Sequence, residues 1–194
     1  KLKTVDTIIS SDTPFGIPSN PKSSKKTPFN VYSIPSKDQD TLLYHIEKGV
    51  RKIEYVKSSE ISKNKQDVDM YKVFITGAAG SGDDPKVMGN PEYGPKNSVC
   101  SQSYLYAPFD TEIEAKNFIK HIKTKFFRVL VSAIKITQSA PKRVYKFVPL
   151  ETLNNTSDID WSKTISEIDQ QLYKKYELSE DEIAFIEEKV QPMD

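Results

Sequence analysis

The stretch TEIEAKNFIKHIKTKFFRVLVSAIK, residues 111–135 of this 194-residue chain, predicts the main helix, because its apolar side chains recur at helical spacing. The apolar stripe consists of Ala115, Phe118, Ile119, Ile122, Phe126, Val129, Leu130 and Ala133. The opposite half carries Lys116, Lys120, Lys123, Arg128 and Lys135. Thr111 is a good N-cap, and the acids Glu112 and Glu114 suit the first turn. We therefore expect one long amphipathic helix over about residues 111–136, ending at or before Pro141.

Charge is strongly segregated along the chain, although the formal net charge is only +1. Residues 115–150 contain nine basic and no acidic residues, whereas residues 158–194 contain eleven acids against four lysines. Such blocks indicate partners rather than a fold. The basic block suits a polyanion, and we expect the acidic segment either to pack on the protein side of such a contact or to lie against another part of the parent chain. The alternative is that the two blocks are solvated faces that touch each other.

The remaining pattern predicts several short strands and a fold of the α+β class. A turn is expected at Glu47–Gly49, a short helix at Leu2–Ile9, and a long loop over the glycine- and proline-rich residues 77–98. The expected strands are Phe29–Ile34, Thr41–Ile46, Arg51–Lys57, Tyr71–Thr76, Ser103–Phe109 and Val144–Val148. They would form a small mixed or antiparallel sheet, covered by the long helix and followed by a C-terminal helical pair over residues 162–176 and 179–190. Ser179 and Glu182 make a capping box for the last helix.

Composition favours a chain that works in the cytoplasm. The mean hydropathy is −0.56, and no apolar run approaches the length of a membrane span. A single cysteine, Cys100, excludes an internal disulfide and suits a reducing compartment. Because the sequence begins with Lys1 rather than methionine, we expect it to be a fragment of a longer chain or a processed chain.

Three stretches imitate catalytic motifs without completing them. TGAAGSG, residues 76–82, lacks the third glycine of a dinucleotide-binding turn and the lysine of a P-loop. NPEY, residues 90–93, has Glu92 where the loop of amino-methyltransferases has a second proline, and EEK, residues 187–189, lacks the upstream aspartate of a nuclease site. The histidines and the cysteine do not have metal-ligand spacing. We therefore predict that this chain is not catalytic by itself and holds neither a metal nor a cofactor.

The stretch NSVCSQSYLYAPFDTEIEAKNFIKHIKTKFFRVLVSAIKITQSAPKRVYKFVPL, residues 97–150, carries a family resemblance. It closely resembles the C-terminal region of bacterial type II restriction–modification proteins, which are adenine-specific DNA methylases with TaqI-like specificity domains, some fused to an endonuclease. SSDTPFGIPSN (10–20), YKVFITGAAGSG (71–82) and the C-terminal segment from residue 160 resemble the same pattern in the same order. The methylase's cofactor-binding and catalytic motifs are missing.

The resemblance implies a target-recognition domain over residues 1–150 and an acidic helical C-terminal extension over residues 151–194. The implied partners are double-stranded DNA and the methylase or nuclease domains of the parent chain, with no membrane involved. The parent would use S-adenosylmethionine for methyl transfer and Mg for any cleavage.

Basic side chains on a helix can neutralise DNA phosphates, and arginine can also bind guanine through two hydrogen bonds. Arg128 and Arg143 are therefore the expected base readers, and Gln138 and Asn97 could pair with an adenine edge. The full set of candidate DNA contacts is Asn97, Lys123, Lys125, Arg128, Lys135, Gln138, Lys142 and Arg143. Two other functions stay open: a separate nucleic-acid-binding or specificity subunit outside this family, and a nuclease in its own right.

Overall fold

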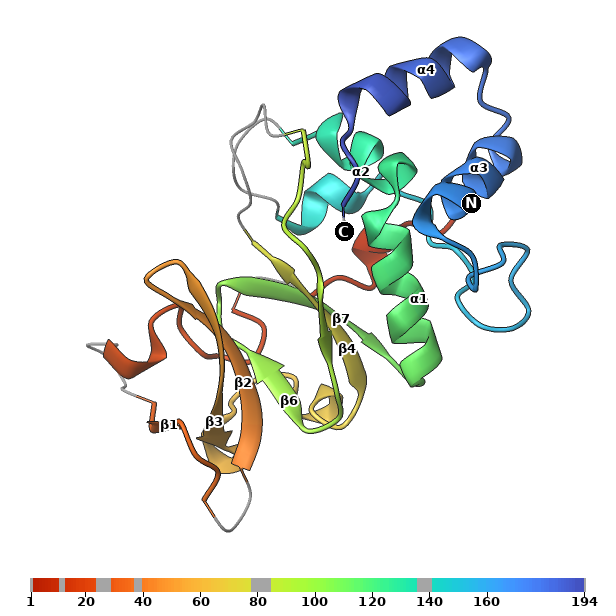
Figure 1. The fold of residues 1–194 in the computed structure, drawn as a ribbon. Coiled ribbons are helices and arrows are strands. Elements are labelled where there is room, and N and C mark those ends of the chain that lie inside the picture. Colours follow the sequence, from red (N-terminus) through yellow and green to blue (C-terminus); the bar gives the residue numbers. More distant parts are fainter. Residues whose placement is uncertain are drawn as a thin grey trace.

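The structure, a computed structural model, describes residues 2–10, 13–23, 29–36, 40–77, 85–135 and 141–193. It has the predicted α+β architecture, with two small sheets on one side and a group of helices on the other (Figure 1). The first sheet has the strand order β1-β3-β2-β6, and the second has the order β5-β4-β7. The seven strands are β1 (Val31–Tyr32), β2 (Asp40–Glu47), β3 (Val50–Lys57), β4 (Tyr71–Thr76), β5 (Glu92–Gly94), β6 (Ser98–Cys100) and β7 (Tyr104–Phe109).

The β2–β3 hairpin confirms the turn predicted at Glu47–Gly49. Lys48 and Gly49 both have positive φ, 51° and 79°, as a tight two-residue hairpin turn requires. Strand β3 pairs antiparallel with β2, and β6 adds to the other edge of β2 in a parallel orientation, so this sheet is mixed. Strand β5 and the first residue of β6 lie within residues 77–98, where the sequence predicted only a long loop, so that prediction was wrong at residues 92–94 and 98.

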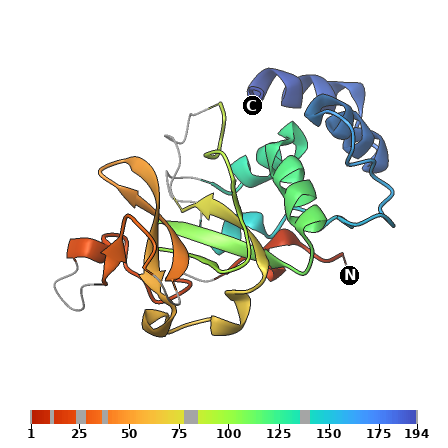
Figure 2. The ribbon, with the colours of Figure 1, turned by 60° about the horizontal axis from the view of Figure 1, so that its bottom comes forward.

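The second sheet forms the middle layer of the molecule, because successive side chains face two different clusters. Val73 and Ile75 of β4 join the core under the helices, whereas Phe74 between them joins a core shared with the first sheet. Leu105 and Tyr106 of β7 divide in the same way. The helices and the four-stranded sheet therefore lie on opposite sides of this layer (Figure 2).

The predicted long helix is two helices, α1 (Glu112–Lys123) and α2 (Lys125–Ser132), so the prediction of one continuous helix over 111–136 was wrong. The break is at Thr124, whose ψ of 148° is extended. Its hydroxyl donates to the carbonyl of His121 at 2.6 Å and accepts from the backbone N–H of Phe127 at 3.1 Å. One buried side chain thus ends α1 and caps α2. Thr111 caps α1 as predicted.

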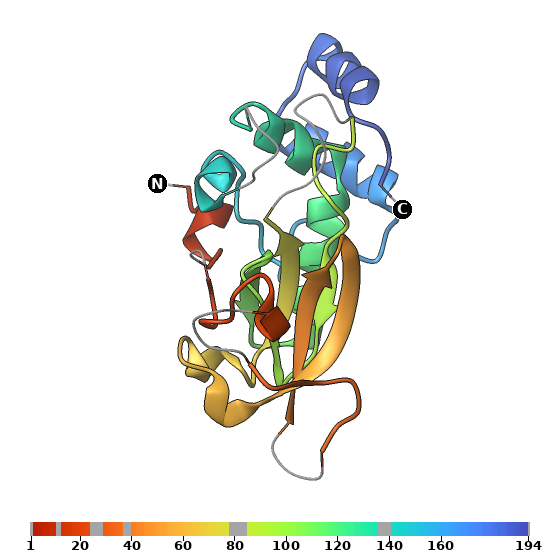
Figure 3. The same cartoon turned by 90° about the vertical axis from the view of Figure 1, so that its left-hand side faces the viewer.

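Residues 142–145 form a short 3-10 helix, η5 (Lys142–Tyr145), so the prediction of a strand over Val144–Val148 was wrong. The burial pattern explains the difference. Val144, Tyr145 and Val148 are buried, but Lys146 and Phe147 are exposed, which is the spacing of a turn of helix rather than the alternation of a strand. The predicted helix over Leu2–Ile9 is limited to a 3-10 turn, η1 (Val5–Thr7), which lies beside η5 (Figure 3).

The C-terminal helical pair is confirmed as α3 (Ile165–Lys175) and α4 (Glu180–Lys189), and Ser179 and Glu182 form the predicted capping box. Ile168 and Leu172 of α3 and Ile186 of α4 belong to the same hydrophobic cluster as α1, α2 and the β4 sheet. The C-terminal helical pair therefore shares one hydrophobic core with α1, α2 and the β4 sheet.

Candidate nucleic-acid interface

Six of the eight predicted contact residues fall at three places in the fold. Lys123, Lys125 and Arg128 line a cavity of about 560 Å³ bounded by α1, α2, α3, α4 and the segment that follows α4. Lys142 and Arg143 lie on η5. Asn97 lies apart from both, directly before strand β6.

Arg128 is fully buried, so the prediction that it lies on the outward half of a helix was wrong. Its guanidinium donates four hydrogen bonds to backbone carbonyls. Nε reaches Thr124 at 3.2 Å and Nη2 reaches Lys123 at 3.1 Å, while Nη1 reaches Gln191 at 2.7 Å and Lys86 at 3.3 Å. These bonds join α2, the C-terminal segment and the segment before β5. Arg128 is therefore a structural clamp.

Asp169 of α3 holds the beginning of α2 in the same cavity. Its two carboxylate oxygens accept the backbone N–H groups of Lys125 at 3.0 Å and Phe126 at 2.9 Å. Burial raises the pKa of this carboxyl from 3.8 to about 6, and the nearby charge of Glu187 adds to the shift. The two backbone hydrogen bonds and the charge of Arg128 act in the opposite direction without cancelling it.

The acidic C-terminal segment neutralises part of the basic window. Lys125 pairs with the carboxylate of Glu187 and also donates to the Glu187 carbonyl at 3.2 Å. Glu187 accepts a further hydrogen bond from the hydroxyl of Tyr173 at 3.0 Å. Lys120 donates to the carbonyl of Trp161. The two charge blocks thus touch each other, as the alternative drawn from the sequence expected, and Lys125 is committed to an ion pair.

Lys123 is the lysine of this cavity with the fewest constraints. It is partly buried, and its ammonium has neither a salt bridge nor a hydrogen bond within the described ranges of the chain. Asp169 and Glu187 also line the cavity, however, and their charges would repel a phosphate that entered it.

Lys135 and Asn97 both form hydrogen bonds within the protein, Lys135 as a buried side chain and Asn97 as an exposed one. Lys135 is 8% exposed and donates to the carbonyl of Val87, so it does not lie on the outward half of a helix as predicted. The amide oxygen of Asn97 accepts a hydrogen bond from the Thr41 hydroxyl at 2.9 Å. Its amide nitrogen donates to the carbonyl of Asp40 at 2.9 Å. Gln138 lies outside the described residues.

The segment η5 presents the predicted cations that remain open to solvent. Lys142, Arg143 and Lys146 are exposed, and in the described parts of the chain none of them forms a salt bridge. Phe147 is 58% exposed, and the Lys146 ammonium lies 4.9 Å from the centre of its ring. This set of four residues, called here the η5 surface, combines three unpaired cations with one exposed aromatic ring.

The η5 surface is held on a rigid base. The hydroxyl end of Tyr145 is buried with Val144 and Val148 in the main core. The N-terminal segment pairs with the residues that follow η5, since the backbone N–H of Leu150 donates to the carbonyl of Lys3 at 3.0 Å. Lys146 and Phe147 were not predicted as contact residues. The sequence did contain a signal for them. The apolar residues Val144, Tyr145 and Val148 have the spacing of a helical turn, and on such a turn Lys146 and Phe147 face outward.

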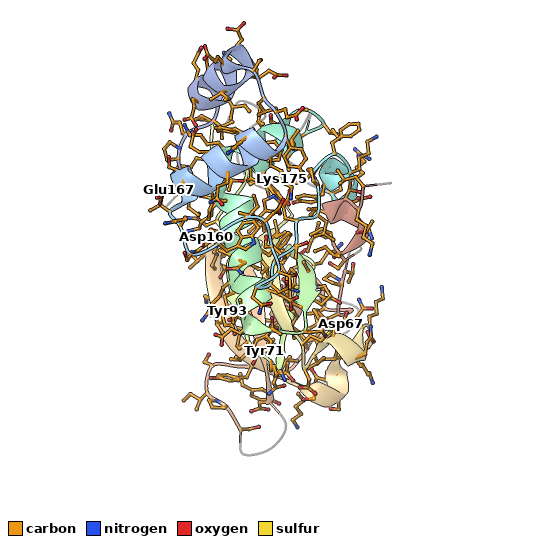
Figure 4. The ribbon with its side chains drawn as sticks, turned by 90° about the vertical axis from the view of Figure 1, so that its right-hand side faces the viewer. Asp67, Tyr71, Tyr93, Asp160, Glu167 and Lys175 are labelled. Carbon is orange, nitrogen blue, oxygen red and sulfur yellow. The ribbon has the colours of Figure 1, made fainter. Side chains whose placement is uncertain are left out.

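A second group of cations and aromatic rings lies at the edge of the β4 sheet near α1. Tyr71 and Tyr93, which lie close together in Figure 4, are stacked with ring centres 6.5 Å apart. Lys96 lies 5.3 Å from the first ring and Lys116 lies 5.7 Å from the second. Lys116 is paired with Glu112 at 2.7 Å, which leaves less free positive charge here than on the η5 surface.

The acids of the C-terminal segment are largely engaged in local structure. Glu167 forms a capping box at the beginning of α3, and Lys175 near its end binds Glu151 at 2.7 Å and Asp158 at 2.8 Å (Figure 4). Lys175 thus ties the segment after η5 to α3. The acidic segment is thus tied to the rest of the fold by ion pairs.

Among the described residues, no group of three or more His, Cys, Asp or Glu side chains is placed to hold a metal ion. Cys100 is buried, and burial raises the pKa of its thiol well above the usual range. No helix within the described ranges is long and apolar enough to cross a membrane. The sequence has no significant match among protein-family models or among curated proteins, so the family resemblance stays a prediction.

Proposed function

We propose that this chain binds double-stranded DNA through the η5 surface, as the target-recognition module of a restriction–modification enzyme. The observation that carries the proposal is the exposure of Lys142, Arg143 and Lys146 without any salt bridge among the described residues. Elsewhere in the basic window, Lys116, Lys120, Lys125 and Lys135 are paired or hydrogen-bonded within the protein. Lys123 lines a cavity that it shares with the acids Asp169 and Glu187. Unpaired cations retain their full attraction for phosphates.

The chemistry of the η5 surface suits a division of roles. Lys142 and Lys146 are point charges that can contact phosphates and so fix position without reading sequence. The guanidinium of Arg143 can donate two parallel hydrogen bonds to a guanine edge in the major groove. The exposed ring of Phe147 can contact a thymine methyl group or a sugar.

The catalytic steps would belong to other domains of the parent protein in this proposal. S-adenosylmethionine would supply the methyl group to an adenine in the methylase domain, and Mg would serve a nuclease domain where one is fused. Such an enzyme would act in the bacterial cytoplasm. A methylase domain in the same open reading frame would distinguish this role from that of a separate specificity subunit.

Titration of a labelled random-sequence duplex tests the proposal directly. If the three cations reach phosphates, we expect a dissociation constant on the order of 10–100 μM at physiological salt, and a log–log salt slope of about −2.7. Selection from a randomised duplex pool would then identify the preferred sequence. An absence of binding at low salt, or binding that does not depend on salt, would contradict the proposal.

A further inference from the structure

An apolar groove runs between α2 and α4, and none of its described lining residues belongs to the η5 surface. Its volume is about 380 Å³, within the roughly 300–1,000 Å³ range of ligand pockets. Helix α2 contributes Phe126, Val129 and Leu130, and α4 contributes Phe185 and Ile186. The groove is therefore walled by two helices and lined mostly by aliphatic and aromatic side chains.

The floor of the groove is firmly packed, and one wall is open. Phe126 is 4% exposed and stacks on Tyr176, with ring centres 4.9 Å apart and an angle of 17° between the planes. Ile186 is also buried. Phe185, in contrast, is 55% exposed although it lines the same groove. Single exposed apolar side chains are common, but one that continues an apolar groove marks a contact surface.

The rim of the groove is acidic. Asp181 and Glu182 line it, Glu180 lies beside them in the first turn of α4, and no basic side chain is among the lining residues that are described. Glu182 is used in the capping box with Ser179. Asp181 is exposed, and its carboxylate forms neither a hydrogen bond nor an ion pair within the part of the chain that is described. Its charge is available to a partner.

This charge pattern selects among the possible occupants. A nucleic acid or an anionic membrane would be repelled by the rim. A second copy related by a two-fold axis would bring Asp181 close to its own equivalent, which like charges disfavour. A partner that carries lysine or arginine beside an apolar face would be attracted. A groove between two helices is also the usual receptor for an amphipathic helix, whose anchors recur at i, i+3 or i+4, and i+7.

We infer that the α2–α4 groove docks a basic amphipathic helix of a partner protein. The apolar face of that helix covers Phe185, Leu130 and Leu178, and its flanking cations face Asp181. This contact is independent of the DNA proposal, because the two surfaces share no residue.

A labelled helical peptide of leucine and lysine, with leucines at helical spacing, is a suitable probe of the full chain in a fluorescence anisotropy titration. The control peptide replaces every lysine by glutamate and keeps the leucines. We expect the lysine peptide to bind at least about tenfold more tightly than the glutamate peptide. Equal binding of the two peptides, or no binding of the lysine peptide, would overturn the inference.

Two matched pairs of variants locate the contact. Phe185→Ser should weaken binding of the lysine peptide about tenfold or more, as loss of a buried aromatic anchor does. Phe147→Ser, which changes a phenylalanine of similar exposure on the η5 surface, should change it less than about twofold. Asp181→Lys should weaken binding more than Glu180→Lys, since Asp181 lines the groove and Glu180 does not. Far-UV circular dichroism checks that each variant is folded.

Two results would assign the groove differently. No loss on Phe185→Ser would show that the peptide binds elsewhere and would overturn the inference. Sedimentation velocity that showed a dimer of the unmodified chain, abolished by Phe185→Ser, would assign the groove to a second copy and overturn it as well.

Discussion

Arg128 and Arg143 have the same side chain and opposite environments. Arg128 lies in the interior and satisfies four backbone carbonyls, whereas Arg143 is exposed and has no salt bridge among the described residues. Burial lowers the pKa of Arg128, but its guanidinium is compensated by these acceptors. The first arginine therefore contributes to stability, and the second is available for binding.

Replacement of Arg128 by alanine should lower the free energy of unfolding by about 2–4 kcal/mol. The physical cause is the loss of donors to four buried or partly buried carbonyls, together with the volume that the side chain leaves empty. Urea unfolding followed by circular dichroism measures it. Arg143→Ala is the matched control and should stay within about 0.5 kcal/mol of the unmodified chain. Equal effects of the two substitutions would contradict the clamp role.

Asp169 should make stability fall as the pH rises from about 4 to 7. Its folded-state pKa, about 6, is raised above its ordinary value of 3.8. The stabilising contribution of the protonated carboxyl is therefore complete below pH 3.8 and is lost as the pH rises through about 6. Asp169→Asn removes this titration. The stability of the unmodified chain relative to that variant should decline over this range by at most about 3 kcal/mol. Urea unfolding of both proteins at several pH values measures the difference, and a constant difference would contradict the assignment.

At the scale of elements, Thr124 decides how the basic window is arranged. In one continuous helix, the side chains after position 124 would face the directions that the helical wheel of residues 111–123 predicts for them. The extended ψ of Thr124 instead changes the direction of α2 relative to α1. Arg128 then points into the interior, and Lys135 reaches the carbonyl of Val87.

Thr124→Ala should lower the free energy of unfolding by about 1–2 kcal/mol, the usual effect of losing a helix cap. The substitution leaves the Phe127 N–H without its side-chain acceptor and the His121 carbonyl without one donor. Thermal unfolding followed by circular dichroism is the measurement. Thr152→Ala, at an exposed position outside the helices, should have an effect within about 0.5 kcal/mol. A similar result for both variants would show that the cap does not stabilise the break.

The sequence predicted the elements whose pattern is local and regular. Alternation identified β2, β3, β4 and β7, and capping residues located the beginnings of α1 and α4. Strands β5 and β6 are three residues each, and they exist because they pair with β4 and β2, which no local pattern encodes. Charge alone could not tell Arg128 from Arg143, because burial depends on which segments pack over each side chain. Lys142 and Arg143 were correctly expected to be accessible, but a link to DNA stays a prediction.

On the scale of the whole molecule, the acidic extension is part of the main fold. Trp161 packs edge-on against His121 of α1 with ring centres 5.7 Å apart, and its indole N–H donates to the carbonyl of Thr152 at 2.9 Å. The pKa of His121 is lowered to about 3 by this burial, with the charge of Lys175 acting in the same direction. The imidazole therefore stays neutral at physiological pH.

A chain that ends at Leu150 should not fold cooperatively. Removal of residues 151–194 would expose Ile122 and Phe126, which share a hydrophobic cluster with Trp161 and Leu172. It would also remove the Asp169 carboxylate from the beginning of α2. We expect loss of near-UV circular dichroism and binding of a hydrophobic dye by the shortened chain. A sharp thermal transition like that of the full chain would show instead that residues 1–150 are an independent domain.

The most direct test of the account compares two triple variants that remove the same charge. Lys142→Gln, Arg143→Gln and Lys146→Gln neutralise the η5 surface. The control neutralises three exposed lysines of the C-terminal segment, Lys163, Lys174 and Lys189. Titration of a random-sequence duplex across a range of salt concentrations should show that the first variant loses at least about tenfold in affinity at low salt. Its log–log salt slope should be smaller by about 2–3, since each lost phosphate contact removes about 0.9. The control should bind within about twofold of the unmodified chain, because its lysines do not contact phosphates. Equal losses in the two variants, or no loss in the first, would contradict a DNA-binding role for the η5 surface.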